Sequence, residues 1–388
     1  MPGRPFTAAA LAAAALGALA PLAQPATITT LREQPGLTRQ VAIDARWVAW
    51  TRCLGQTGPT EVWAARRGTT TSGPIRGIRA PGACETATLV GVSGDRVVLL
   101  LPIGGGLRKL VSVDPTTGVQ TLLDTDTPLD DGVRITSADV AGPTVTWLRE
   151  VGAGNGREAD VLQAPADGTQ PPHTVYQRSL IYGAVHPVAV WGTAGGAVVV
   201  RELLTGAVYG YGIGQEQAVL VDGTRRTALA GMSGGAHIAT ADFANGWFVY
   251  TLVRDGSNKV MVMARNVHTG ARRALRTLVL PRTVPVQSPA VPVPTIAGNI
   301  AAWRERLRVP GGFRERIVAS DLARRKQGAV VLLRDSLGQR LFMSQPAAFT
   351  TRVAFATVHL ANASGPLGGY LGQAPVGARS GIQVTRLR

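Results

Sequence analysis

The sequence has few of the residue types from which catalytic and metal sites are most often built. Among its 388 residues there are only two cysteines and five histidines, and lysine occurs only at positions 109, 259 and 326. No two histidines have the spacing of a zinc-binding pair on a helix. We therefore predict no catalytic residue, no metal ligand and no cofactor. The five histidines are His173, His186, His237, His268 and His359.

Negative charge is also scarce. The chain has 24 acidic residues against 40 basic ones, which leaves a formal net charge of +16. Two interpretations are open: the surface attracts an acidic partner, or it is only a solvated basic surface. The arginines are spread along the whole chain and do not alternate with exposed aromatic residues, which argues against nucleic acid as the partner. An anionic polymer of a cell wall stays open as a partner.

Long apolar stretches are missing except at the N-terminus. Arg4 precedes residues 6–20, which are almost entirely alanine and leucine and are too short to span a bilayer comfortably. We predict a signal peptide over residues 1–26, with the cleavage site open because Pro21 directly follows the small-x-small sequence Ala18-Leu19-Ala20. An uncleaved N-terminal anchor is the alternative. We expect a secreted or cell-envelope protein whose mature chain has no transmembrane segment.

What the sequence does have is a repeat. Seven short apolar runs follow one another at successive steps of 50, 47, 53, 50, 53 and 52 residues. This pitch matches a four-stranded propeller blade and is too long for most helical solenoids. Two stacked sheets are the alternative, but they would give no reason for equal repeats. We predict an all-β, monomeric, seven-bladed β-propeller of four-stranded antiparallel blades over residues 27–388, with the bulky anchors Trp50, Leu100, Trp147, Val200, Tyr250, Trp303 and Phe355.

The ends of the chain are predicted to close the ring. Residues 27–31 have strand character and precede the first blade, and a propeller must join its last blade to its first. In the seventh blade we expect strands over 347–350, 352–359, 370–374 and 383–387. Helix content should be very low, because the apolar residues alternate or run in short blocks without a 3.6-residue period.

One blade carries a pattern that resembles a known family. Residues 109–114 read Lys-Leu-Val-Ser-Val-Asp and are followed by Pro-Thr-Thr-Gly at 115–118, and residues 317–321 match in part. The pattern is similar to the TolB-type propeller repeats of exported bacterial proteins. The resemblance implies a secreted or periplasmic binding scaffold of the kind that docks other proteins. Because the blades repeat while their loops can vary, our leading hypothesis is an exported, non-catalytic propeller that binds a protein or an anionic cell-envelope polymer. A propeller-type lyase or hydrolase, with its site at the mouth of the central channel, is the alternative.

The two cysteines are predicted to form a disulfide. Cys53 follows the second strand of the first blade, and Cys84 lies in the loop that leads to the next blade. In a propeller these two kinds of loop open on the same face, and thiols oxidise in an exported chain.

Arginines recur at the outgoing end of the second strand of several blades. If the blades are in register, these residues form a rim that would attract carboxylate or phosphate groups. The alternative is that the neighbouring Glu150, Glu202, Asp255 and Glu305 pair with them. The candidate rim consists of Arg52, Arg149, Arg201, Arg254, Arg304 and Arg306.

A Gly-x-Ser-x-Gly sequence, Gly231-Met232-Ser233-Gly234-Gly235, matches the nucleophile turn of many hydrolases. That turn leads from a strand into a helix, whereas a strand is predicted to follow here. We interpret the segment as a connector between two blades.

Four carboxylates, Asp124, Asp126, Asp130 and Asp131, lie in the connector between the second and third blades. Such oxygen-rich loops suit Ca²⁺, but the spacing differs from that of the helix-flanked calcium loop. A solvated turn is the interpretation we favour.

Overall fold

The structure is a computed structural model that describes residues 26–31, 34–53, 59–69, 71–80, 87–128, 132–152, 158–179, 185–204, 215–232, 235–280, 291–309, 312–323, 330–336, 341–360 and 378–386. Within these residues all regular secondary structure is β-strand, as the apolar pattern predicts. Accordingly, these ranges contain no helix long and apolar enough to cross a membrane.

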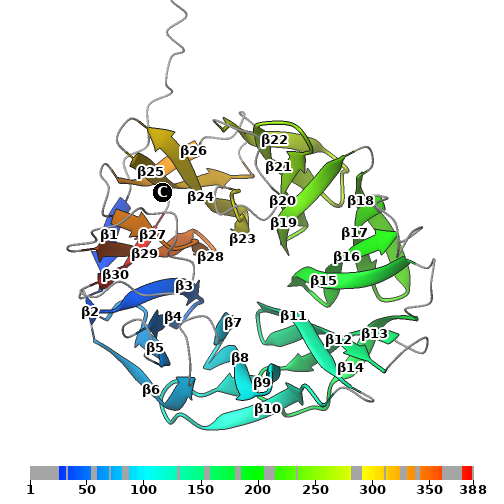
Figure 1. The fold of residues 1–388 in the computed structure, drawn as a ribbon, viewed down its shortest axis with the longest axis horizontal. Helices are drawn as coiled ribbons and strands as arrows, with labels where there is room; N and C mark the ends of the chain where they lie inside the picture. Colours follow the sequence, from blue (N-terminus) through cyan, green and yellow to red (C-terminus); the bar gives the residue numbers. More distant parts are fainter. Residues whose placement is uncertain are drawn as a thin grey trace, which may run out of the picture.

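The described strands form seven antiparallel sheets around a central axis, which confirms the predicted propeller (Figure 1). Blade 1 has β3 Leu37–Ile43, β4 Trp47–Cys53, β5 Thr60–Arg66 and β6 Ser72–Ala80. Blade 2 has β7 Thr88–Ser93, β8 Arg96–Gly104, β9 Leu107–Val113 and β10 Gln120–Thr125. Blade 3 has β11 Arg134–Ala141, β12 Thr144–Val151, β13 Glu158–Pro165 and β14 His173–Ser179.

The remaining blades repeat this order from the channel outward. Blade 4 has β15 Val185–Ala194, β16 Ala197–Leu204, β17 Gln215–Asp222 and β18 Arg225–Met232. Blade 5 has β19 Ala236–Ala244, β20 Trp247–Arg254, β21 Lys259–Asn266 and β22 Arg272–Val279. Blade 6 has β23 Thr295–Ala297, β24 Ile300–Val309, β25 Gly312–Asp321 and β26 Val330–Ser336. Blade 7 has β28 Ala347–Phe349, β29 Arg352–Leu360, β30 Ala378–Arg386 and β1 Ala26–Thr30, with β27 Leu341–Met343 paired to β29 and β2 Gln34–Pro35 paired to β30.

Blade 7 closes the ring with strands from both ends of the chain. The N-terminal β1 pairs with the C-terminal β30, which confirms the predicted clasp. The assignment of residues 383–387 to the fourth strand was wrong, because β30 pairs directly with β29 and is the third strand. The third strand expected at 370–374 lies outside the described residues. Since the N-terminal strand takes the outer position, the edge of β30 is covered and the two ends of the chain are tied together.

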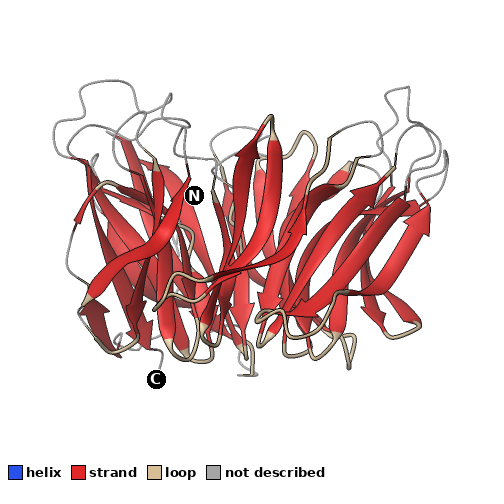
Figure 2. Cartoon of the chain, turned by 90° about the horizontal axis from the view of Figure 1, so that it is seen from below, coloured by secondary structure: helices blue, strands red, loops and turns tan. Residues whose placement is uncertain are grey.

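The two faces of the disc differ (Figure 2). On one face, short turns join the first strand of each blade to the second and, in blades 1 to 5, the third to the fourth; we call it the turn face. Gly94, in the turn between β7 and β8, has a φ of 59°, a value that glycine adopts without strain. The opposite face carries the connections between blades and the loops between second and third strands.

Large side chains of the second strands hold adjacent blades together. Trp147 is fully buried against Val98 and Leu100 of blade 2, and Trp303 packs in the same way on Val249 of blade 5. Each anchor thus fills the space between its own blade and the preceding one.

The anchor predicted for blade 2 is displaced by one residue. Val97 pairs with Val92 as Val145 pairs with Val140, so the equivalent of Trp147 is Leu99 and not Leu100. Leu99 packs on blade 1, whereas Leu100 packs on Trp147 of blade 3. Since side chains alternate between the two faces of a strand, a shift of one residue exchanges the neighbouring blade. Both positions are apolar, which is why the sequence pattern did not separate them.

Candidate functional site

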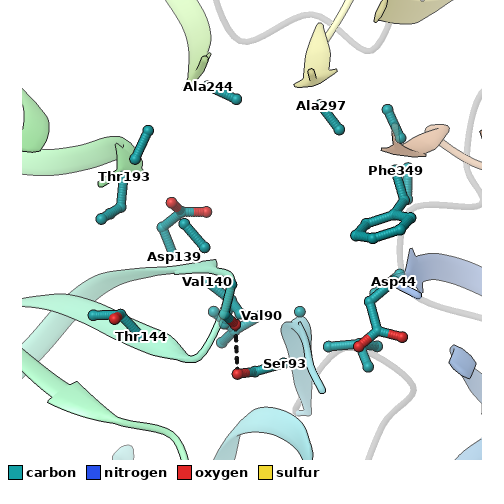
Figure 3. A pocket seen from close by; sticks show the side chains of 18 of the residues that line it. Asp44, Val90, Ser93, Asp139, Val140, Thr144, Thr193, Ala244, Ala297 and Phe349 are labelled. Carbon is teal, nitrogen blue, oxygen red and sulfur yellow. Dashed lines mark hydrogen bonds between the residues drawn. The ribbon is translucent and has the colours of Figure 1, made fainter. Parts of the chain in front are cut away.

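The first strand of every blade lines a central channel with a volume of about 1420 Å³ (Figure 3). This volume is larger than that of most small-molecule pockets. At one level of the ring the first strands carry equivalent residues, most of which are small. In blade order these residues are Ala42, Gly91, Asp139, Gly192, Asp242, Thr295 and Ala347.

Side chains of one blade accept hydrogen bonds from the inner strand of the next. The backbone N–H of Leu89 donates to Gln40 Oε1 at 2.7 Å, and that of Val190 donates to Ser137 Oγ at 2.8 Å. Ser93 Oγ in turn donates to the carbonyl of Gly142 at 2.6 Å, the contact drawn in Figure 3. These bonds provide partners for backbone groups along the inner edges of the blades, which would otherwise be costly to bury.

The side chain of Asp242 in blade 5 likewise accepts a hydrogen bond from the inner strand of the next blade. Its Oδ2 accepts the N–H of Ile296 in blade 6 at 2.8 Å, and its Oδ1 accepts the N–H of Phe243 at 2.7 Å. Burial raises the pKa of Asp242 to about 7, and the negative charge of Asp139 contributes to this rise. The carboxyl group therefore exchanges a proton near neutral pH.

Asp139 occupies the same position in blade 3. Burial raises its pKa, and the backbone N–H groups of Val140 and of Thr193 in blade 4 act in the opposite direction. In Figure 3 its carboxylate and that of Asp44 lie on different sides of the channel. Asp139 and Asp242 were not predicted from the sequence. Alignment of the blades by their turns would have shown two aspartates at a position otherwise held by small residues.

Five of the six predicted rim arginines have partners within the described part of the chain. Arg52 donates from Nε to the carbonyl of Pro35, and its guanidinium lies 4.6 Å from the centre of the Trp63 ring. Burial lowers the pKa of Arg52. The remaining contacts join Arg149 to Asp160 at 3.4 Å and to Asp124 at 3.9 Å, Arg201 to Glu216 at 2.7 Å, Arg304 to the carbonyl of Met343 at 2.6 Å and Arg306 to Glu315 at 3.4 Å.

Arg254 is the exposed member of the set. Three of the acidic residues next to these arginines in the chain, Glu202, Asp255 and Glu305, have partners on other strands. Glu202 is fully buried and pairs with Arg226 at 2.6 Å, and Glu305 pairs with Arg276 at 2.9 Å. The rim is thus a set of mixed charges at the ends of the second strands, and its role in binding stays a prediction.

Cys53 is buried at the end of β4. Cys84 lies outside the described residues, as do residues 1–25, so the disulfide and the signal peptide stay predictions.

The Gly-x-Ser-x-Gly segment begins with the last two residues of β18 and is followed directly by β19, so a strand follows it, as predicted. Ser233 and Gly234 lie outside the described residues. His237 on β19 has its Nε2 3.0 Å from Asp255 Oδ2 and its Nδ1 3.8 Å from Glu216 Oε2. The contact between His237 and Glu216 joins blade 5 to β17 of blade 4.

In the acidic connector, Asp124 accepts the indole N–H of Trp147 at 2.7 Å, and Asp126 accepts the N–H of Ile135 at 2.7 Å. Asp130 and Asp131 are outside the described ranges. No group of three or more potential metal ligands occurs among the residues that the structure describes.

No protein-family model and no curated protein matches this sequence. Among solved structures, puromycin hydrolase is 14% identical over 84% of this chain and 50% of its own, with a TM-score of 0.54. The β-propeller domain of the Trilobed protease from Pyrococcus furiosus is 7% identical over 84% of this chain and 90% of its own, with a TM-score of 0.51. TolB from Acinetobacter baumannii is 11% identical over 74% of this chain and 65% of its own, with a TM-score of 0.43.

These similarities concern the fold alone. The chain spans about half the length of puromycin hydrolase. The predicted resemblance to TolB is confirmed only as a propeller fold, since propellers of peptidases match this chain at least as well.

Proposed function

We propose that the protein is an exported, non-catalytic β-propeller that binds a protein or an anionic cell-envelope polymer on its surface. Export is supported by the N-terminal sequence over residues 1–26, in which Arg4 precedes an alanine- and leucine-rich stretch. Seven similar blades form one rigid frame that leaves its turns and loops free to vary, and this architecture suits recognition.

The observation that carries the non-catalytic part of the proposal is the bonding of Asp242. Both of its carboxylate oxygens accept backbone N–H groups, one of them from the next blade. A catalytic carboxylate must have an oxygen directed at its substrate. Each oxygen of the Asp242 carboxylate is engaged in a structural hydrogen bond, one of which joins blades 5 and 6, and burial together with the charge of Asp139 accounts for its raised pKa.

A lyase or hydrolase is the second candidate function. It draws support from the same channel, because two carboxyl groups with raised pKa values in a cavity are a feature of acid–base sites.

The test is to incubate the purified protein with an extract of the cell envelope. We expect a stable complex that can be isolated and an extract whose composition does not change. The double variant Asp139→Asn/Asp242→Asn should form the same complex. If the wild type converts a component of the extract and this variant does not, the protein is an enzyme and the proposal is wrong.

A further inference from the structure

We infer that the turn face of blades 7 and 1 binds an anionic polymer through Arg67, Arg352 and Arg386, which we call the arginine cluster. The inference rests on the proposed binding function and names both its partner and its site. It also assigns binding to a different face from the predicted rim, which lies at the outgoing ends of the second strands.

The first observation is a pair of like charges held side by side. Arg352 at the start of β29 lies directly opposite Arg386 at the end of β30 in the strand ladder. Residues directly opposite each other project from the same side of a sheet, and like charges in this position are destabilising. Arg386 is exposed and Arg352 half-buried.

The second observation is a third arginine from the neighbouring blade. Arg67 directly follows β5, the third strand of blade 1, and its guanidinium lies 5.8 Å from the centre of the Phe349 ring in blade 7. Its Nη1 donates to the carbonyl of Asp44 at 3.0 Å, which fixes its position. Burial and the positive charge of Arg352 both lower the pKa of Arg67, so the two guanidinium groups are close enough to repel.

Two carboxylates, Asp44 and Asp95, lie near the cluster, and the negative charge of Asp44 offsets part of the repulsion at Arg67. Asp44 Oδ1 accepts the N–H groups of Arg46 and Trp47, both at 2.7 Å, and so closes the turn in which it lies. Asp95 forms an ion pair with the Arg46 side chain. The neighbouring Arg66 is exposed and lies toward blade 2, with its guanidinium 5.5 Å from the centre of the Trp47 ring, and its charge lowers the pKa of Asp95.

The chemistry of arginine selects the ligand. Guanidinium groups stay charged at all physiological pH values, so the repulsion cannot be relieved by loss of a proton. Their planar N–H groups match phosphate and carboxylate oxygens. Because the cluster spans two blades on an open face, a polymer with repeated anionic groups would contact several arginines at once. The net charge of +16 would attract such a polymer from a distance.

The experiment measures binding of long-chain inorganic polyphosphate to the full chain by fluorescence anisotropy at 50, 100 and 200 mM salt, roughly the range over which charge-driven binding changes most. The test variant is Arg352→Gln/Arg386→Gln. The matched control is Arg76→Gln/Arg334→Gln, which removes two exposed charges from β6 and β26. Thermal unfolding of each variant, together with the single exposed variant Arg386→Gln, shows whether the fold is kept.

We expect the test variant to bind polyphosphate about tenfold or more weakly than the wild type. The slope of log K against log salt concentration should become less negative by about two, while the control stays within about twofold of the wild type.

Equal losses in both variants would show a general charge effect and overturn the inference. It would also be overturned if free phosphate competed as well as the polymer per phosphate group, or if duplex DNA bound more tightly than polyphosphate. Polyphosphate that does not bind while the extract still yields a complex would refute the inference and leave the proposed function standing. Conversion of the extract would refute the proposed function and leave the polyphosphate result unaffected.

Discussion

Like charges are brought together in two regions of this propeller, and the protein accommodates them in different ways. In the channel, Asp139 and Asp242 are near enough for the charge of one to raise the pKa of the other. Each receives backbone N–H groups, and a proton can be taken up when the pH falls. On the turn face, Arg352 and Arg386 are directly opposed and Arg67 adds a third charge.

The difference lies in what can neutralise each group. A carboxyl group can be protonated within the physiological range once burial has raised its pKa, so the channel pair needs no ligand. A guanidinium group cannot lose its proton there, so the repulsion in the arginine cluster is reduced by nearby negative charge, from a bound anion or from ions in solution. A second opposed pair, Arg265 and Arg272, lies at the turn face of blade 5. Directly opposed arginines on neighbouring strands thus occur at the turn face of two blades.

The largest expected effect comes from removing a large side chain that packs between two blades. Trp303 is fully buried in the same cluster as Ile296, whose N–H binds Asp242. Replacement by alanine should lower the free energy of unfolding by about 3 to 5 kcal/mol, because it leaves a cavity between blades 5 and 6. Urea denaturation measures the loss. Val200→Ala at the equivalent position of blade 4 should cost clearly less, and equal costs would contradict the anchor role of the tryptophan.

The next effect is a pH dependence that Asp242 imposes. Its pKa rises from 3.8 to about 7 on folding, so the folded state binds the proton more tightly. The stability that this proton adds is fully present below the unfolded pKa and is lost as the pH rises through about 7. The loss should be on the order of a few kcal/mol between pH 5 and pH 8, measured as the free energy of unfolding in urea.

Asp242→Asn is the matched variant for this dependence. Its amide cannot provide both acceptors, so we expect a variant that is about 1 to 3 kcal/mol less stable at pH 5 because one N–H group is left without a partner. Its stability should nevertheless change much less than that of the wild type between pH 5 and pH 8. A wild-type decline that persists in the variant would assign the titration to another group.

A smaller effect is expected from the partner carboxylate. Asp139→Asn removes the negative charge that raises the pKa of Asp242. The midpoint of the decline in stability should therefore move to lower pH, toward the ordinary range of an aspartate. A titration of the carboxyl carbons by NMR follows Asp242 directly. An unchanged midpoint would mean that the two groups do not interact.

The smallest effect concerns the arginine cluster in the absence of a ligand. Arg352→Gln removes the directly opposed charge and should stabilise the protein by a few tenths to about 1 kcal/mol at low salt. The gain should disappear in high salt, because screening weakens the repulsion in the wild type as well. Thermal unfolding at both salt concentrations measures it. Arg334→Gln on the exposed surface of β26 should change neither midpoint.

The fold could be predicted from the sequence because a blade is a local unit. Each blade repeats the same order of turn, anchor and strand, so the seven anchors reveal the pitch without any knowledge of contacts. Leu99 was missed because Leu100 is equally apolar and only the pairing of Val97 separates them. The third strand of blade 7 was missed because its neighbour, β1, comes from the other end of the chain.

The charged regions were harder to predict, because they depend on which blades meet. Arg67 and Arg352 are far apart in sequence and come together only through the closure of blade 7 on blade 1. The rim arginines could be located on their strands, but their partners could not: Arg304 donates to the carbonyl of Met343, which no charge pattern indicates. Sequence periodicity therefore predicts the number and order of the blades, whereas contacts between blades determine which charged side chains come together.

The most direct test of this comparison is the position of a bound anion. Crystals of the protein soaked in sodium selenate should show anomalous density beside the guanidinium groups of Arg352 and Arg386, and none beside Asp139 or Asp242. Density at other arginines with none at the cluster would contradict the account, since it would show that the opposed charges on the turn face are satisfied within the protein.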